Sequence, residues 1–342
     1  MNENRPLKDI VDYFKGKRIL ITGAGGFIGS HLSRLFHTNG IFVRAVDIKW
    51  DGFIKEPYYS EKITRDLRIL DNCTDVVADS DLVFNFAANM GGIGFITKFG
   101  AEIMYDNVLI NTFIAKACVE EKVDRLFFSS SACVYPTFKQ TRVDVRSLKE
   151  SDAIPADPDN FYGWEKIFTE KMLESFSRDF GLDVRIARLH NIYGPEGTYK
   201  GGREKSLAAL CRKVAEASNP GEIEIWGDGL QTRSYCYIDD CLEGILRLIL
   251  SDCHEPLNIG SDRLISINDL ADLIISISGK RILKKYNPTA PQGVRGRNSD
   301  NTKLRQTLNW EPQTPLEEGL KRTYTWIEQM VKKDLSSSFH TL

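Results

Sequence analysis

A glycine turn near the amino terminus, with the spacing G-x-x-G-x-x-G over residues 23–29, constrains the fold more than any other segment. The β-rich run 17–22 precedes the turn, and a helical pattern with apolar residues at Ile28, Leu32 and Leu35 follows it. In such a strand–turn–helix unit, glycines let the backbone approach a pyrophosphate, and the free N–H groups of the helix bind its charge. The residues predicted to form this dinucleotide site are Gly23, Gly26, Phe27, Ile28 and Gly29.

Two acidic residues extend the predicted dinucleotide site. The next strand, 41–46, ends at Asp47, about twenty residues after the turn, where a carboxylate accepts hydrogen bonds from the adenosine ribose. Because this carboxylate would repel a 2′-phosphate, the sequence predicts NAD as the cofactor and not NADP. Asp66 closes another short strand and is expected to bind the adenine amino group, although a solvated loop acid fits its position equally well.

Strands and helices alternate from residue 17 to residue 189, without internal repeats or segments of low complexity. The strand 82–88 is almost continuously apolar, as expected in a parallel sheet that is covered on both faces. This alternation predicts an α/β fold with a Rossmann-type, doubly wound parallel sheet. We expect an NAD-binding domain over 15–190, completed by part of 235–260. A smaller, mixed α/β substrate-binding lobe would comprise 191–234 and 261–335.

Charge and cysteine content restrict the possible partners. Lys and Arg number 45 against 47 Asp and Glu in a chain of 342 residues, so no overall field attracts nucleic acid or an anionic membrane. No apolar run approaches the ~20 residues that span a bilayer, and residues 1–5 lack the basic start of a signal peptide. The seven cysteines are scattered without the spacing of metal ligands, which is typical of reduced thiols in a cytosol. We therefore expect a cytoplasmic protein without a metal site.

A second functional segment combines the serines 129–131 with Tyr162 and Lys166. The apolar run 125–128 leads into these serines and Cys133, which predicts a buried strand that ends in a polar, ligand-binding loop. Tyr162 and Lys166 are four residues apart and would project from one helix face, where the cation would favour the phenolate. Tyr162 would then be a base usable near neutral pH. The same spacing is also common in purely structural helices.

Cations gather in the second half of the chain. Three of them fall within residues 200–205, and others follow in glycine-rich stretches after the strand 222–226. We expect this lobe to cover the carboxyl edge of the sheet and to bring its cations to a cleft, the alternative being that they are solvated surface residues. The cations concerned are Lys205, Arg233, Arg295 and Arg297.

The glycine turn, Ser131 and Tyr162-x-x-x-Lys166 together resemble the extended short-chain dehydrogenase/reductase superfamily, whose members rework nucleotide sugars. Further segments narrow the resemblance to the GDP-mannose 3,5-epimerase family and extend over nearly the whole chain. They are residues 90–96, 130–136, 190–195, 200–205, 226–234 and 293–301. One departure is Asn89, which stands where the family's pattern has an aspartate. If that side chain contacts the sugar or the nicotinamide, substrate choice or rate would differ.

The resemblance also implies roles for individual residues. Tyr162 would be the redox base beside Lys166, and Ser131 would hydrogen-bond the reacting hydroxyl. Cys133 and Lys205 would be an acid/base pair. The implied substrate contacts are Gly91, Ser131, Ala132, Cys133, Asn191, Glu204, Lys205, Ser206, Lys213, Gln231, Thr232, Arg233, Ser234 and Arg295.

The chemistry of a double epimerisation agrees with these roles. A sugar carbon that bears only C–H and C–O bonds can be inverted once its hydrogen is acidified. If Tyr162 takes the C4 hydroxyl proton while a hydride leaves C4, the resulting ketone acidifies the hydrogens on C3 and C5. Cys133 and Lys205 could then exchange protons on opposite ring faces, since a thiol ionises near pH ~8.5 and nearby cations favour the thiolate. The expected reaction converts GDP-mannose to GDP-L-galactose or GDP-L-gulose.

Several alternatives remain open at this point. A 4,6-dehydratase would usually carry an acid at position 133, and a simple 4-epimerase needs no acid/base pair beyond Tyr162. A catalytically silent nucleotide-binding protein could use the same fold. A homodimer is expected from the superfamily resemblance and two amphipathic helices, 103–118 and 161–180, although each helix could be covered within the chain.

We predict that NAD co-purifies with the protein and is not consumed during turnover. The grounds are Asp47, which favours NAD over NADP, and a cycle in which the hydride leaves C4 and returns to it. The measurement is the absorbance and mass of the cofactor released on denaturation, followed by turnover without added nucleotide. A requirement for stoichiometric NADPH would contradict the prediction.

Overall fold

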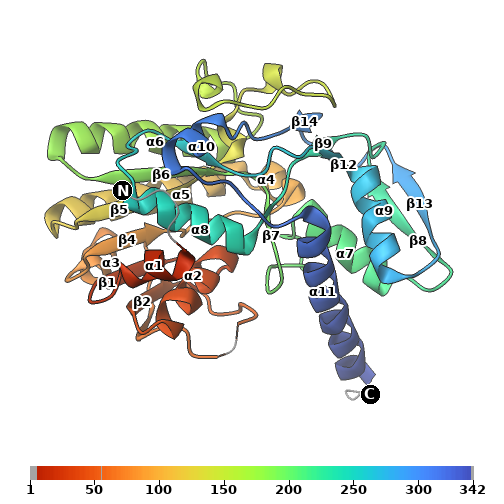
Figure 1. Cartoon of the computed structure of the whole chain (residues 1–342), viewed down its shortest axis with the longest axis horizontal. Helices are drawn as coiled ribbons and strands as arrows, with labels where there is room; N and C mark the ends of the chain where they lie inside the picture. Colours follow the sequence, from red (N-terminus) through yellow and green to blue (C-terminus); the bar gives the residue numbers. More distant parts are fainter. Residues whose placement is uncertain (1–5, 55, 340–342) are drawn as a thin grey trace.

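A seven-stranded parallel sheet forms the larger part of the computed structural model, which describes residues 6–54 and 56–339 (Figure 1). Its strands lie in the order β11-β6-β5-β4-β1-β2-β3, and every neighbouring pair is parallel. The strands are β1 (Arg18–Thr22), β2 (Phe42–Asp47), β3 (Glu61–Thr64), β4 (Leu82–Asn85), β5 (Arg125–Ser131), β6 (Val184–Leu189) and β11 (Leu257–Ile259). The order reverses between β1 and β4, and ligands bind at the carboxyl edge beside such a reversal. The predicted doubly wound sheet is confirmed.

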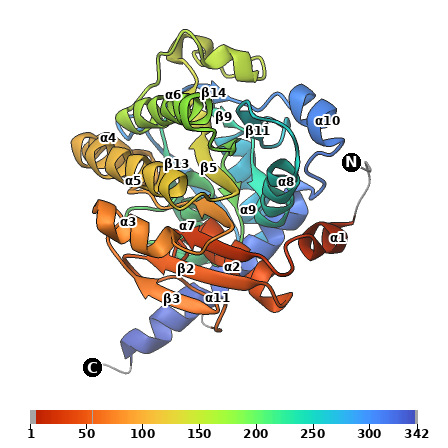
Figure 2. The same cartoon turned by 90° about the vertical axis from the view of Figure 1, so that its left-hand side faces the viewer.

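Helices cover both faces of this sheet because its strands are apolar on both sides (Figure 2). Ile19 and Ile21 of β1 contribute to the core on one face, while Leu20 between them contributes to the core on the other. One face carries α1 (Leu7–Asp12), α2 (Phe27–Thr38) and α8 (Ile238–Leu250). The other face carries α3 (Leu70–Val77), α5 (Gly100–Glu120) and α6 (Phe161–Phe180).

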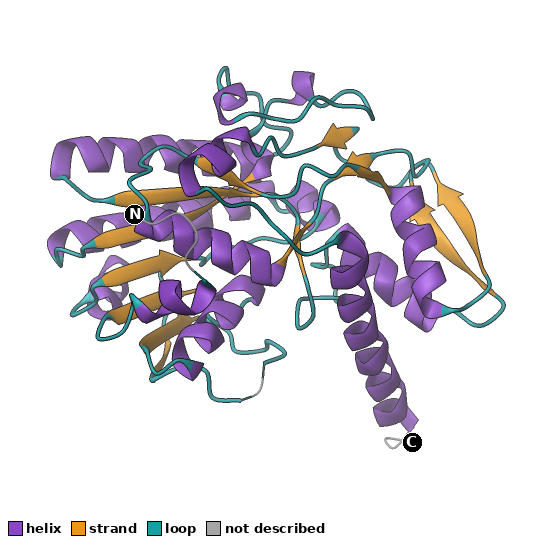
Figure 3. Cartoon of the chain, in the orientation of Figure 1, coloured by secondary structure: helices purple, strands orange, loops and turns teal. Residues whose placement is uncertain are grey.

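A smaller lobe adjoins the carboxyl edge of the sheet (Figure 3). Its helices are α7 (Ser206–Glu216), α9 (Ile267–Ser278) and α11 (Leu316–Phe339), whereas α10 (Thr302–Leu308) packs against β11 of the large sheet. Its strands pair as β8 (Gly221–Trp226) with β13 (Ile282–Asn287), and as β12 (Ile265–Ser266), β9 (Thr232–Arg233) and β14 (Gly296–Arg297). Between the two parts lie α4 (Ile93–Lys98), β7 (Ile192–Tyr193) and β10 (Cys236–Tyr237). Three 3₁₀ turns complete the fold: η1 (Ala132–Val134), η2 (Thr137–Lys139) and η3 (Glu150–Ala153).

One helix is longer than its pattern in the sequence indicates. The amphipathic period predicts a carboxyl-terminal helix from about Leu316 to Met330, whereas α11 continues to Phe339. Val331 is buried but Leu335 is 56% exposed, so the apolar period does not mark the additional turns. Within residues 6–54 and 56–339, no helix combines the length and the apolar character needed to cross a membrane. The prediction about residues 1–5 lies outside the described residues.

A buried ion pair fixes α6 against the sheet. Arg188 of β6 donates through Nη2 to Oε2 of Glu170 at 2.6 Å and through Nε to Oε1 at 2.9 Å. The hydroxyl of Ser130 on β5 donates to the same carboxylate at 2.5 Å. Glu170 is only 3% exposed and Arg188 only 4%, so each charge depends on its partner. This pairing sets the position of α6, whose first turn carries Tyr162, relative to β5, which ends at Ser131.

We predict that Glu170→Leu lowers the free energy of unfolding by about 3–5 kcal/mol, because it leaves the Arg188 guanidinium buried without a counter-charge. Urea unfolding followed by circular dichroism measures the change. The matched control is Lys116→Ala, which removes an exposed pair with Glu120 and should cost at most about 0.5 kcal/mol. Equal losses in the free energy of unfolding of the two variants would show that the buried Glu170–Arg188 pair stabilises the protein no more than the exposed pair does.

Candidate active site

The glycine turn forms a close-packed cradle at the end of β1. Gly23 has a φ of +67°, and a Cβ there would lie 2.7 Å from the backbone carbon of Phe86. A Cβ on Gly29 would lie 2.3 Å from the Gly23 oxygen. Gly26 is the N-cap of α2, so its neighbours Phe27 and Ile28 form the first helical turn. The turn therefore leaves the N-terminus of α2 accessible to a phosphate, as the sequence predicted.

Asp47 lies against this cradle. Its carboxylate accepts hydrogen bonds from the backbone N–H of Gly25 at 2.9 Å and of Lys49 at 3.0 Å. Burial raises the pKa of Asp47, and these two hydrogen bonds oppose the shift because they favour the charged form. The structure thus brings the predicted cofactor residues Gly23, Gly26, Gly29 and Asp47 together.

Asp66 is placed differently from the other predicted cofactor residues. Arg68 donates to both of its carboxylate oxygens, with Nη2 at 2.7 Å from Oδ2, and this pairing holds the pKa of Asp66 below its ordinary value. Arg68 also donates to Asp106 of α5 at 2.9 Å. The contact between Asp66 and an adenine stays a prediction, and the carboxylate is already paired within the chain.

Tyr162 is buried near the end of β5, beside Ser131 and Cys133. Burial raises the pKa of Tyr162 well above its ordinary value, the charges of Glu165 and Cys133 act in the same direction, and a hydrogen bond with Ser131 opposes the shift. The expectation that Lys166 alone makes this phenol a base near neutral pH is therefore wrong for the chain by itself. The Lys166 ammonium pairs with Oε1 of Glu165 at 3.4 Å and lies 5.4 Å from the centroid of the Tyr162 ring.

A polar network that the sequence analysis missed surrounds the buried Glu165. Asn107 donates to Oε1 of Glu165 at 2.9 Å, and Asn111 donates to Oε2 at 3.4 Å. Burial raises the pKa of Glu165, while the nearby Lys166 ammonium and these donors stabilise its charged form. The available signal was the pair of asparagines four residues apart, which share a helix face with apolar residues such as Ile103, Ile110 and Ile114.

Cys133 lies in the η1 turn, with a cation against its sulfur. Arg297 of β14 donates from Nη1 to Sγ at 3.3 Å, and its other nitrogens contact Oε1 of Gln140 at 2.6 Å and Oδ1 of Asp159 at 3.4 Å. The sequence analysis placed Arg297 in the cleft but did not pair it with the thiol. A guanidinium that donates to sulfur stabilises the negative charge of a thiolate.

Lys205 is the N-cap residue of α7, and its charge interacts with that of Cys133. Water reaches its side chain, yet the surrounding protein lowers the pKa of the ammonium through desolvation, and Cys133 opposes that shift. A lysine with a lowered pKa exchanges protons more readily near neutral pH. Tyr162 and Lys205 each interact electrostatically with Cys133, so the structure brings these three groups near one another.

Two predicted substrate contacts present unpaired polar atoms. Oε1 of Gln231 and Oγ of Ser234 are buried without a hydrogen-bond partner in the described part of the chain. Gln231 itself is fixed, because its Nε2 donates to the Trp226 oxygen at 2.9 Å. Buried polar atoms are normally hydrogen-bonded, so these two atoms are available to a ligand.

The remaining predicted contacts are held by the protein itself. Asn191 donates to the Ser234 oxygen at 2.9 Å, and Lys213 donates to the Glu224 oxygen at 2.8 Å. Arg233 donates to two backbone oxygens, and burial lowers its pKa to about 10. Thr232 donates to Val143, Arg295 pairs with Asp228, Glu204 pairs with Arg212, and Ser206 lies 3.2 Å from the Tyr235 hydroxyl. Gly91 and Ala132 are buried in the loops after β4 and β5.

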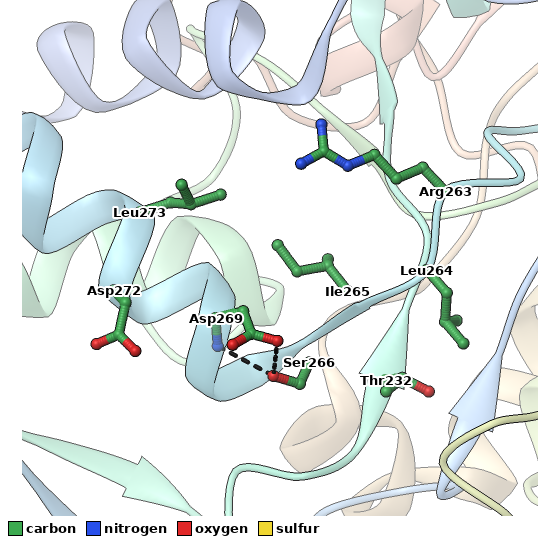
Figure 4. A pocket seen from close by; sticks show the side chains of 8 residues that line it. All are labelled: Thr232, Arg263, Leu264, Ile265, Ser266, Asp269, Asp272 and Leu273. Carbon is green, nitrogen blue, oxygen red and sulfur yellow. Dashed lines mark hydrogen bonds between the residues drawn. The ribbon is translucent and has the colours of Figure 1, made fainter.

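A hollow of about 640 Å³ lies between β9 and the start of α9 (Figure 4). Its polar side chains are already paired: Ser266 accepts from the Asp269 N–H at 3.0 Å, and Arg263 donates to Glu317 at 2.7 Å. Thr232 is the one predicted site residue that lines it.

Comparisons with known proteins agree with this arrangement. The model of the NAD dependent epimerase/dehydratase family matches residues 19–260. The chain is 48% identical to GDP-mannose 3,5-epimerase 1 of Oryza sativa subsp. indica over 93% of this chain and 83% of that protein. It is 47% identical to the GDP-mannose 3,5-epimerase of Arabidopsis thaliana, over 93% and 84% respectively.

Solved structures show the same fold. The UDP-glucose 4-epimerase of Thermotoga maritima superimposes with a TM-score of 0.84 and 27% identity, covering 92% of this chain and 99% of that one. The UDP-glucuronic acid 4-epimerase of Bacillus cereus, solved with UDP-glucuronic acid and NAD, has a TM-score of 0.78 and 26% identity, with the same coverage of 92% and 99%.

Proposed function

This chain belongs to the NAD dependent epimerase/dehydratase family, and we propose that it is an NAD-dependent isomerase that epimerises GDP-mannose at C3 and C5. The observation that carries the proposal is the grouping of the Cys133 thiol, its Arg297 donor and Lys205 beside Tyr162. The identity of 48% with a GDP-mannose 3,5-epimerase over 93% of the chain supports the substrate. The products would be GDP-L-galactose and GDP-L-gulose.

The cradle around Gly23 and the Asp47 carboxylate support NAD as the cofactor. A side chain at Gly23 or Gly29 would occupy the space that the close-packed turn needs, and Asp47 is held where it can accept from a ribose hydroxyl. When bound, NAD would accept the hydride from C4 and return it, and its positive charge would favour the Tyr162 phenolate.

Tyr162 begins the reaction at C4. Its phenolate takes the proton of the C4 hydroxyl, and Ser131, which hydrogen-bonds the phenol, orients that hydroxyl. The oxidised sugar is a 4-ketone, so the hydrogens on C3 and C5 become acidic. Lys166, paired with Glu165, contributes positive charge beneath the Tyr162 ring and not a direct hydrogen bond to the phenol.

Cys133 and Lys205 then carry protons on opposite faces of the ring. One group removes the proton from carbon while the other returns a proton from the opposite side, which inverts the centre. Arg297 donates a hydrogen bond to the Cys133 sulfur, and desolvation lowers the pKa of Lys205, which favours its neutral amine. A 4-epimerase needs neither group, and a dehydratase needs an acid where Cys133 stands. The thiol therefore separates this proposal from both alternatives.

The two parts of the chain would bind different ligands, NAD in the larger part and the nucleotide sugar in the smaller one. We propose an NAD-binding domain over 15–190 with part of 235–260, since β11 and α8 join the large sheet and its covering layer. The segments 191–234 and 261–335 would bind the nucleotide sugar. We propose a cytoplasmic location on the cysteine pattern and charge balance of the sequence.

We predict opposite partial reactions for two variants. Tyr162→Phe removes the hydroxyl that starts oxidation, so neither NADH absorbance nor deuterium from D₂O appears. Cys133→Ala leaves the Tyr162 centre intact, so hydride transfer persists while exchange at C3 and C5 falls by ~10²–10⁴-fold, the typical effect of one acid/base group. Single-turnover absorbance and NMR of GDP-mannose incubated in D₂O give the two readouts.

Cys253→Ala is the control for the thiol chemistry, because this cysteine lies after α8 and its sulfur donates to the Glu255 oxygen. It should leave both readouts at the wild-type level. If Cys133→Ala exchanges C3 and C5 hydrogens at the wild-type rate, the thiol serves packing alone and the epimerase mechanism is wrong.

We also propose that two copies pair through α5 and α6. These helices lie side by side on one face of the molecule (Figure 2). Their outer surfaces expose large aromatic side chains, which include Tyr105, Phe161, Trp164, Phe168 and Phe180. Phe161, Trp164 and Phe168 follow helical spacing and form one stripe. A second copy that presents the same helices would bury this stripe in a four-helix bundle.

We predict a homodimer by light scattering at micromolar concentration and a monomer for Phe168→Glu, because the new charge would be buried at the centre of the interface. Leu283→Glu is the control, since Leu283 is 72% exposed on β13, away from both helices. A wild-type monomer, or dissociation of both variants, would refute the proposed interface.

A further inference from the structure

The loop that follows β4 and the loop that precedes α7 are joined along their backbones. The N–H of Gly92 donates to the oxygen of Arg203 at 3.0 Å. The contact is close, because a Cβ on Gly92 would lie 2.3 Å from the oxygen of Glu204. One loop carries Gly91, a predicted sugar contact, and the other ends at Lys205. Their relative position therefore determines where the Lys205 amine lies above the sugar.

The Arg203 side chain reinforces this junction. Its Nη1 donates to Oδ1 of Asn89 at 3.1 Å and to the oxygen of Met90 at 3.0 Å. Its guanidinium also lies 3.9 Å from the centroid of the Phe95 ring on α4, a stacking distance. Arg203 thus contacts the β4 loop through hydrogen bonds and α4 through an aromatic face. The guanidinium is planar, so both kinds of contact form in one orientation, which a lysine cannot reproduce.

Asn89 links Arg203 to a carboxylate farther back. While its Oδ1 accepts from Arg203, its Nδ2 donates to Oδ2 of Asp106 at 2.9 Å. Asn107 holds the backbone of Asn89 as well, accepting from its N–H at 2.6 Å. An aspartate at position 89 would bring two carboxylates together at the Asp106 contact. The departure from the family's pattern is therefore matched to Asp106, and both polar atoms of the Asn89 side chain are paired within the protein.

We infer that Arg203 is a positioning residue for the proton-transfer step, which holds Lys205 in register with the sugar-binding loop through Asn89, Met90 and Phe95. The inference rests on the proposed function and deepens it. Helix α7 fixes Lys205 on its carboxyl side, whereas Gly201 and Gly202, both with positive φ, precede Arg203 on the other side. Those glycines leave the backbone few constraints of its own, so the Arg203 contacts supply them.

The test compares Arg203→Met and Arg203→Lys with a matched control, Arg263→Met, which removes an exposed arginine–carboxylate pair with Glu317 outside both loops. For Arg203→Met we expect deuterium exchange at C3 and C5 to fall about 10²-fold, the cost of a displacement near 1 Å. Hydride transfer from C4 and the KM for GDP-mannose should not change. Arg203→Lys should restore only part of the exchange, and the control should match the wild type.

A second readout needs no substrate. The acetylation of Lys205 by acetic anhydride, followed by peptide mass spectrometry across a pH series, reports how its amine titrates. In Arg203→Met the loosened loop moves the Lys205 amine away from the protein groups that desolvate it, so the midpoint of the Lys205 profile moves to higher pH, towards that of freely exposed lysines in the same sample. In Arg263→Met the midpoint stays at the wild-type value.

The two readouts separate the possible failures. If exchange and hydride transfer fall together, or if neither changes, Arg203 is not a positioning residue for Lys205. An unchanged Lys205 profile also overturns the inference. If the wild type incorporates no deuterium into GDP-mannose, the proposed function fails. The pH profile of Lys205 acetylation then tests by itself whether Arg203 positions Lys205. Should Arg203→Met fail to fold, Arg203→Lys is judged by the same criteria.

Discussion

The packing of α6 against the sheet through buried charges is the constraint on which the site depends. Burying Glu170 of α6 with Arg188 of β6 costs desolvation energy that the pair recovers only in one arrangement. An apolar face could slide along the strands, whereas this pair aligns in a single register. At the amino-terminal end of α6, Gly163 allows close packing, because a Cβ there would lie 2.2 Å from the oxygen of Cys133. This packing places Tyr162 beside the end of β5.

The small sheet of the second lobe, which contains β9 and β14, brings arginine side chains towards Tyr162 and Cys133. Arg233 of β9 and Arg297 of β14 are direct partners in a parallel pair, so two guanidinium groups lie close together. Burial and the charge of Arg297 lower the pKa of Arg233, which means that the pair is held at an energetic cost. An anionic ligand would offset this repulsion. The arrangement therefore supports a negatively charged substrate, although the net charge of the whole chain is only −2.

Local patterns in the sequence predicted what depends on local physics. The amphipathic pattern over 103–118 correctly predicted the helix that forms α5, and the glycine turn correctly predicted a strand–turn–helix unit. The contact between Cys133 and Arg297 joins residues 164 positions apart, and no spacing rule encodes such a pair. The pKa direction of Tyr162 was missed for the same reason. It depends on burial and on where the Lys166 ammonium turns, and both are set by tertiary packing.

The sheet alone cannot explain a double epimerisation, because 4-epimerases share it with a TM-score of 0.84. What differs must lie on the loops at its carboxyl edge, where chemistry can change without altering the core. Ser131 links the loop that carries Cys133 to the proposed oxidation centre around Tyr162. Its hydroxyl hydrogen-bonds Tyr162 and also accepts from the backbone N–H of Cys133 at 3.1 Å, which caps the η1 turn. In the proposed mechanism, the residue that would orient the oxidation step therefore also fixes the turn that carries the thiol, so the two steps would share one geometry.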